Sequence, residues 1–148
     1  LYFDHLFPMG VDAMQEAIRL VREKKAPRIK QDESRATYEG WCKTTDAVID
    51  WSKSYDQVYN LIRGCNPQPG AHSTYDGTRL NIFDSRIGSS DTNERPGTVI
   101  AISDAGVEVA AGVGSVMLKR VRPPGSSKLP ARQYAADVGL SNGEILGT

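Results

Sequence analysis

The stretch that decides the fold of this chain is Asn60–Ala71, which reads NLIRGCNPQPGA. It begins as the end of an apolar-striped helix, and Gly64 suits a position just past a helix end, where a left-handed backbone penalises a Cβ atom. Pro67 and Pro69 fix φ and remove two amide donors, so the loop holds one shape without ladder bonds. We therefore expect a stiff joint between a packed helix and a β-rich second half.

The composition of the 148 residues is that of a globular protein, with 39% hydrophobic and 24% charged residues. Eighteen basic residues balance eighteen acidic ones, which argues against a dominant phosphate-binding role, because nucleic-acid affinity rests largely on basic side chains. No apolar run approaches the ~20 residues that span a bilayer. Cys42 and Cys65 lack metal-ligand spacing, so we expect reduced thiols in a cytoplasmic protein and no metal site.

Upstream of the joint, apolar residues at helical spacing predict a helix from about residue 11 to residue 24, after a break at Pro8-Met9-Gly10. Residues 26–33 are polar and aperiodic, which is typical of a linker. Residues 36–43 predict a strand that Gly40 weakens. The pair Ser54 and Gln57 forms a capping box that begins the helix of the joint.

After the joint, short apolar segments separated by turn residues predict antiparallel strands. Asp76-Gly77 predicts a tight hairpin, Asp104-Ala105-Gly106 a second one, and residues 116–121 a further strand. Pro130 begins a short helix, and Ile145 and Leu146 of the tail can tuck against the sheet. Short strands that must avoid open edges commonly form a small barrel, so the fold class is mainly β with α (α+β).

Four phrases occur in a fixed order along the chain. They are Ala36-Thr37-Tyr38, Ile49-Asp50-Trp51-Ser52, Ile62-Arg63-Gly64, and Asn66-Pro67 with Pro69-Gly70-Ala71. Together they resemble the C-terminal domain of the folate-dependent formyltransferases, a family that includes methionyl-tRNA formyltransferase and the hydrolase domain of 10-formyltetrahydrofolate dehydrogenase. The resemblance implies a small open OB-like antiparallel barrel with one inserted and one C-terminal helix.

The resemblance also implies a domain division. Residues 1–25 would be the helical end of an upstream α/β catalytic domain, residues 26–33 a linker, and residues 34–148 the OB-like domain. The chain opens on the apolar residues Leu1-Tyr2-Phe3, so we expect its start to be a cut inside a larger protein.

Members of this family move a formyl group from the co-substrate 10-formyltetrahydrofolate to an amine acceptor or to water. The resemblance places their catalytic asparagine, histidine and aspartate, and their folate-binding loop, in the upstream domain. None of these is in this sequence, so we expect no catalytic residue here and expect this piece alone to be inactive. Its expected role is to brace the catalytic domain and to shape the acceptor cleft. Phe7-Pro8 with Gly10, and Lys25-Ala26-Pro27-Arg28, look closer to the hydrolase domain than to the tRNA enzyme.

Two residues of the joint are candidate substrate-binding residues, Arg63 at the helix end and Asn66 in the loop. A guanidinium beside a stiff loop would bind a substrate anion, or would bond loop carbonyls that lack partners. For Arg63 we favour the structural role. His5 and His72 are not at catalytic positions of the family, and we expect packing or surface roles for both.

Lys119, Arg120 and Arg122, with Lys128 and Arg132 nearby, form the one basic cluster in the sequence. In a tRNA-binding barrel they would contact the phosphate backbone. Strand alternation would place Lys119 and Val121 on one face and the two arginines on the other, which splits the cluster. A solvated strand end is therefore the favoured interpretation.

Four aromatic residues would stack nucleic-acid bases or would belong to the barrel core: Tyr38, Trp41, Tyr75 and Phe83.

Two other classes of function stay open. In the first, the chain is a stand-alone OB-like module that binds tRNA or RNA. In the second, it is a protein-interaction domain. The partners expected under the leading hypothesis are the upstream catalytic domain and a formyl acceptor, with tRNA less favoured because of the balanced charge, and no membrane. The identity of the acceptor and the oligomeric state are left open.

Overall fold

A computed structural model describes all residues, 1–148, and the chain divides into two compact units, Leu1–Glu39 and Gly40–Thr148. The first unit begins with a π-helical turn, Tyr2–Leu6, that runs into helix α1, Phe7–Arg22. The break expected at residues 8–10 is therefore wrong. Pro8 lies in the first turn of α1, where a backbone N–H has no intrahelical partner and a proline ring is tolerated.

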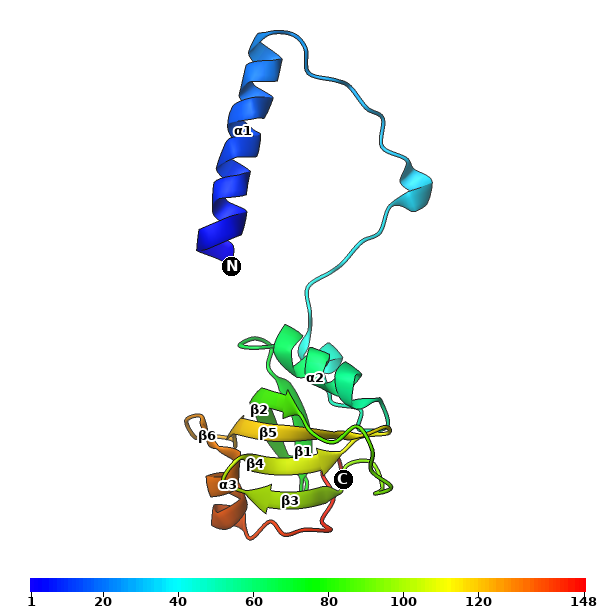
Figure 1. The fold of residues 1–148 in the computed structure, drawn as a ribbon, viewed down its shortest axis with the longest axis vertical. Helices are drawn as coiled ribbons and strands as arrows, with labels where there is room; N and C mark the ends of the chain where they lie inside the picture. Colours follow the sequence, from blue (N-terminus) through cyan, green and yellow to red (C-terminus); the bar gives the residue numbers. More distant parts are fainter. The chain divides into compact units, whose positions relative to one another are not determined.

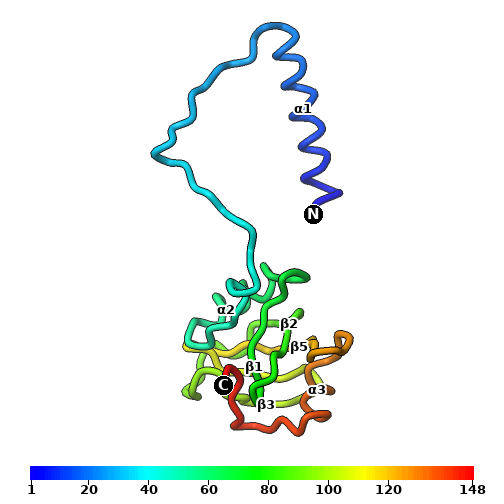
Figure 2. Tube along the Cα trace, turned by 180° about the vertical axis from the view of Figure 1, so that it is seen from behind, coloured from blue at the N-terminus to red at the C-terminus, as the bar shows by residue number.

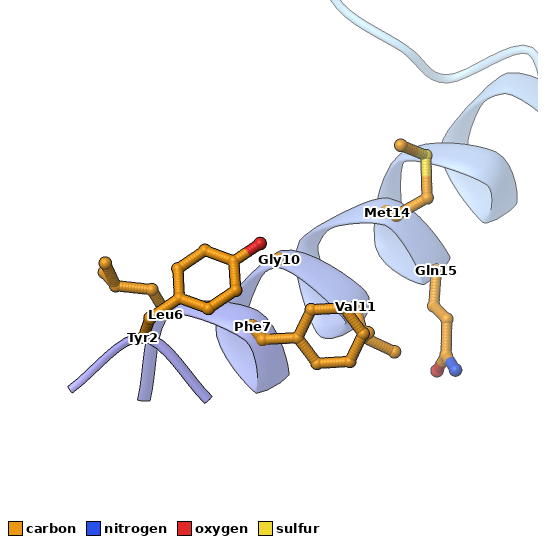
Figure 3. A pocket seen from close by; sticks show the side chains of 7 residues that line it. All are labelled: Tyr2, Leu6, Phe7, Gly10, Val11, Met14 and Gln15. Carbon is orange, nitrogen blue, oxygen red and sulfur yellow. The ribbon is translucent and has the colours of Figure 1, made fainter. Parts of the chain in front are cut away.

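Helix α1 carries an apolar stripe that is exposed within its own unit, and no residue of the helix is buried. The stripe and the preceding turn form an open groove, in which the ring of Phe7 lies beside Val11 (Figure 3). The groove is lined by Tyr2, Leu6, Phe7, Gly10, Val11, Met14 and Gln15.

The segment after α1 is extended apart from one turn, Glu33–Arg35. The strand expected at residues 36–43 is absent, and the side chains of Tyr38 and Trp41 are 91% and 92% exposed. Strand preference is expressed only where the backbone pairs with a neighbour and the side chains pack on it. Residues 36–43 pair with no strand, so this segment does not become a strand in spite of its aromatic residues. As a result, helix α2 precedes all the strands.

The second unit is an antiparallel sheet with helices packed on it (Figure 1). Its strand order is β1-β2-β5-β4-β3, with β6 paired to β5, and the strands do not close into a ring, which confirms the α+β fold class with an open sheet. The strands are β1 Ala71–Tyr75, β2 Thr78–Ile87, β3 Val99–Ser103, β4 Gly106–Ala110, β5 Ser115–Arg122 and β6 Leu129–Pro130.

Turn chemistry sets the register of the first hairpin. Asp76 and Gly77 both have positive φ, 49° and 66°, which matches the twist of antiparallel strands, and Tyr75 lies opposite Thr78. Between β2 and β5 the register shifts on either side of Asp84. Such irregularities bend strands, and beyond this point β5 pairs with β6 in place of β4.

Two helices cover the sheet. Helix α2, Tyr55–Gly64, packs against β2 and β5, and helix α3, Ala131–Val138, packs against β4, β5 and β6. The N–H of Ser54 donates to the Gln57 side chain at 3.3 Å, as the capping box predicted. The most completely buried large side chains of the core are Ile62, Leu80, Ile82, Leu118, Val58, Val99, Val107, Val109, Val116 and Val121.

The C-terminal tail joins the two edge strands of the sheet (Figure 2). The N–H of Val99, in β3, donates to the carbonyl of Glu144 at 2.8 Å. The N–H of Gly147 then donates to the carbonyl of Thr74, in β1, at 2.8 Å. Leu146 is buried, as expected. The tail thereby satisfies backbone groups on both edges.

None of the helices is both long enough and apolar enough to cross a membrane.

Candidate functional site

The joint does not turn where the sequence suggested. Gly64 is the last residue of α2, and Cys65 continues the right-handed backbone with φ −87°, so the left-handed position expected at Gly64 is wrong. The left-handed residue is Gly70, with φ 83°. Its N–H donates to the carbonyl of Cys65 at 2.9 Å, so the chain reverses direction after the prolines, directly before β1.

Asn66 ties the joint to strand β2. Its Nδ2 donates to the carbonyl of Phe83 at 2.9 Å. Gly70 lies against the same residue, because a Cβ at Gly70 would be 3.4 Å from Phe83 Cε1 and 3.0 Å from Asn81 Nδ2. The loop is thus fixed on β2 at the point where the register between β2 and β5 shifts.

Arg63 projects from the exposed side of α2. Its guanidinium lies 5.2 Å from the ring centroid of Tyr59, and its Nη1 donates to Asn60 Oδ1 at 3.5 Å. It makes no hydrogen bond to the loop carbonyls. The bonds to loop carbonyls favoured for Arg63 are therefore absent, and the binding role of Arg63 and Asn66 stays a prediction.

Replacing Arg63 with alanine is expected to change the free energy of unfolding by no more than about 0.5 kcal/mol, since exposed side chains with few partners cost little to remove. The Asn66→Ala variant is expected to cost about 1 kcal/mol through the lost bond to Phe83. Urea denaturation of both variants checks this. A larger loss for Arg63→Ala than for Asn66→Ala would show that Arg63 holds the joint.

A cationic cluster surrounds Phe83, and we call Phe83, Arg122 and Lys128 the Phe83 cluster. The guanidinium carbon of Arg122 lies 5.0 Å and the Lys128 Nζ lies 3.8 Å from the ring centroid. The ring itself is buried at 5% exposure, so it holds the two cations in place and is not available to stack on a base.

The other aromatic candidates lie apart from this cluster. Tyr38 and Trp41 are exposed in the extended segment, and the Tyr75 hydroxyl donates to Glu144 Oε1 at 2.9 Å. This bond raises the pKa of Tyr75, with burial adding to it, and it links β1 to the tail.

Strand register places further polar groups beside the Phe83 cluster. His72, Asn81 and Arg122 lie opposite one another across β1, β2 and β5. The Arg79 Nε donates to Asn81 Oδ1 at 2.9 Å. Sequence reasoning missed Arg79, which could have been found from its place next to Thr78 at the start of the hairpin's second strand. These side chains and a loop line a hollow of about 360 Å³: Arg79, Asn81, Arg122, Pro123, Pro124, Gly125 and Ser126.

His72 is half-buried at the edge of this group, and its Nδ1 has no hydrogen-bond partner. Burial lowers the pKa of His72, and the nearby Arg79 lowers it further. Its carbonyl accepts from the N–H of Ile49 at 2.8 Å. His72 therefore packs against the sheet, whereas His5 is exposed in the first unit.

The predicted basic run is divided by the shift in register. Val121 is buried and Arg120 and Arg122 are exposed, as alternation predicted. Lys119 does not share the face of Val121, because the pairing skips it: Leu118 lies opposite Ser85 and Arg120 opposite Asp84. Only Arg122 of the three reaches Phe83.

Arg132 is engaged elsewhere, because it forms an ion pair with Asp104. No group of three or more His, Cys, Asp or Glu side chains is placed to hold a metal ion.

Comparison with known proteins gives a consistent result. The family model described as "Formyl transferase, C-terminal domain" matches residues 42–139. The methionyl-tRNA formyltransferases of Moorella thermoacetica and Hydrogenovibrio crunogenus are 36% and 34% identical to this chain over 144 residues. Each alignment covers 97% of this chain and 46% of the relative, so the chain spans about half the length of these relatives.

Solved structures show the same fold. HypX from Aquifex aeolicus, crystallised in complex with tetrahydrofolic acid, superimposes with a TM-score of 0.65 at 20% sequence identity. The match covers 90% of this chain and 24% of that one. A variant of the same protein superimposes with a TM-score of 0.63 over 86% of this chain.

Proposed function

Because this chain belongs to the formyl transferase C-terminal domain family, we propose that it is the C-terminal part of an enzyme that transfers a formyl group from 10-formyltetrahydrofolate to the amino group of methionyl-tRNA. The observation that carries the proposal is the 36% identity to a methionyl-tRNA formyltransferase over 97% of the chain. An alignment of that extent includes both units. The resemblance of residues 7–10 and 25–28 to the hydrolase domain carries less weight than this identity.

In this proposal the helical part of the first unit belongs to an upstream catalytic domain. Residues 1–25 would be its last helix, residues 26–33 the linker and residues 34–148 the C-terminal domain. The apolar groove along α1 (Figure 3) supports this division, because contiguous exposed apolar surface marks a site of contact. The formyl chemistry and the binding of 10-formyltetrahydrofolate would reside upstream, and this piece alone would be inactive.

The second unit would face the acceptor. The cations of the Phe83 cluster, with Arg120 and Lys119 on the same strand, would contact the phosphate backbone of the tRNA. Arg63 and Asn66 would border the cleft for the aminoacyl end. The net charge of the chain is zero, so we expect this unit to make only a few phosphate contacts. Most of the affinity for tRNA would then come from the rest of the enzyme.

The proposal is tested with the full-length protein, extended upstream from this chain. We expect it to form formyl-methionyl-tRNA from 10-formyltetrahydrofolate, and we expect the chain of 148 residues alone to form none. Release of formate without tRNA would assign water as the acceptor and overturn the proposal. Tight binding of tRNA by the chain alone, with no transfer by the full protein, would favour the stand-alone RNA-binding module.

The double variant Arg122→Ala/Lys128→Ala in the full-length protein is expected to raise the KM for methionyl-tRNA about tenfold and to lower the salt dependence of binding by about two counterions. Arg132→Ala is a matched control, because its cation is already paired with Asp104. Equal effects of the two changes would place the tRNA elsewhere.

A further inference from the structure

The chain's two cysteines, which are far apart in sequence, meet in the second unit. The Sγ atoms of Cys42 and Cys65 lie 3.9 Å apart and are separated by 23 positions. Cys42 is exposed and Cys65 is buried at 2% exposure. Neither thiol has a role in the function proposed above.

We propose that Cys42 and Cys65 form a redox modification site, in which a hydroperoxide converts the two thiols into a reversible intramolecular disulfide. A disulfide bond is about 2.05 Å long, so the sulfurs must approach by roughly 2 Å. Cys42 allows this movement, because it lies in the extended segment that precedes the turn Thr44–Ala47. Cys65, at the end of α2, provides the fixed partner.

The chemistry takes place in two balanced steps. The Cys42 thiolate attacks the peroxide, so that an S–O bond forms and the O–O bond breaks, and the hydroxide or alkoxide that leaves takes up the proton that Cys42 released, giving water or an alcohol. The Cys65 sulfur then attacks Cys42, the S–S bond forms, the S–O bond breaks, and the hydroxide that leaves takes the Cys65 proton. The two thiols are oxidised, and the hydroperoxide is reduced.

Exposure assigns the order of these steps. Cys42 meets the oxidant first because Cys65 is buried. Burial raises the pKa of Cys65 to about 11, with the contact to Cys42 adding to the effect, so Cys65 keeps its proton until Cys42 has reacted.

The cross-link would attach the first residues of the second unit to the end of α2. Residue 42 lies three positions after Glu39, the last residue of the first unit. A disulfide here would close a loop that contains the buried Trp51 and would restrain the segment that enters the unit. Loop closure stabilises mainly by restricting the unfolded chain.

The test uses the full chain, reduced, freed of reductant and treated with hydrogen peroxide. Peptides give the decisive readout, because Met9 and Met14 are exposed and also oxidise. Trypsin places Cys42 in residues 36–43 and Cys65 in residues 64–79. We expect a disulfide to join these two peptides and reduction to separate them. We also expect the Tm of the oxidised protein to rise by about 5 °C.

Cys42→Ser is the control, since an exposed serine is compatible with the fold. It is expected to give no joined peptides and no rise in Tm with peroxide. The proposal fails if wild-type protein accumulates sulfinic acid at Cys42 while Cys65 stays a thiol. It also fails if oxidation joins two chains through Cys42.

Discussion

Replacing Trp51 with alanine is expected to lower the free energy of unfolding of the second unit by about 3–5 kcal/mol. The indole is 5% exposed within the core. Its Nε1 donates to Ser73 Oγ at 2.9 Å, and a Cβ at Gly147 would lie 3.1 Å from its Cδ1. Trp51 therefore touches both β1 and the tail, and its loss leaves a cavity and an unpaired hydroxyl.

Urea denaturation followed by circular dichroism measures this loss. Trp41→Ala is the matched control, because Trp41 is 92% exposed and its replacement is expected to cost less than about 0.5 kcal/mol. Trp51→Phe should fall between the two, since it restores most of the volume and none of the hydrogen bond. Equal losses at positions 41 and 51 would contradict the burial assigned to Trp51.

Gly106→Ala is expected to destabilise the second unit by about 3 kcal/mol or more. Gly106 begins β4 with φ 139°, a backbone conformation that disfavours a side chain. A Cβ there would overlap the carbonyl oxygen of Leu118 and lie 3.1 Å from its carbonyl carbon. Leu118 pairs with Val107 in the sheet, so this backbone cannot move without breaking the ladder.

Gly64→Ala is the control for this change. Gly64 lies in the last turn of α2, and a Cβ added there would meet no atom within 4 Å. Alanine at this position is therefore expected to be neutral or to stabilise by about 0.5–1 kcal/mol. The midpoint of thermal unfolding should thus fall for Gly106→Ala and should stay the same or rise for Gly64→Ala. A loss at Gly64 similar to that at Gly106 would show that Gly64 needs a conformation that alanine cannot adopt.

The elements that sequence predicted well are those fixed by local chemistry. Asp76-Gly77 specifies its hairpin because the turn needs two residues with positive φ. Ile49 and Trp51 belong to the second of the four phrases, and both are buried. The family resemblance rested on the phrases around these residues, and the match of the family model over residues 42–139 confirms it.

The elements that were missed depend on tertiary context. The aromatic residues at 37–41 favour a strand, but no neighbour pairs with them. A proline breaks a helix when it lies in the helix interior, but Pro8 lies in the first turn of α1. Gly64 resembled a helix-ending glycine, but the reversal comes at Gly70, after both prolines.

The candidate site was predictable only in its parts. The sequence indicates Asn66 and Arg122 separately, and the structure brings both to Phe83, beside the register shift between β2 and β5. Shifts of this kind follow from packing and leave no fixed pattern in a sequence. The approach of Cys42 to Cys65 likewise depends on tertiary structure, because 23 positions separate the two residues in the sequence.

The bridging tail has a kinetic consequence. The hairpins β1–β2 and β3–β4 pair residues that are near in sequence, so their loops close at small entropic cost. The bond from Tyr75 to Glu144 joins residues 69 positions apart, and contacts of such separation slow folding. We therefore expect the tail to dock last, so that substitutions in residues 143–147 accelerate unfolding far more than they slow folding.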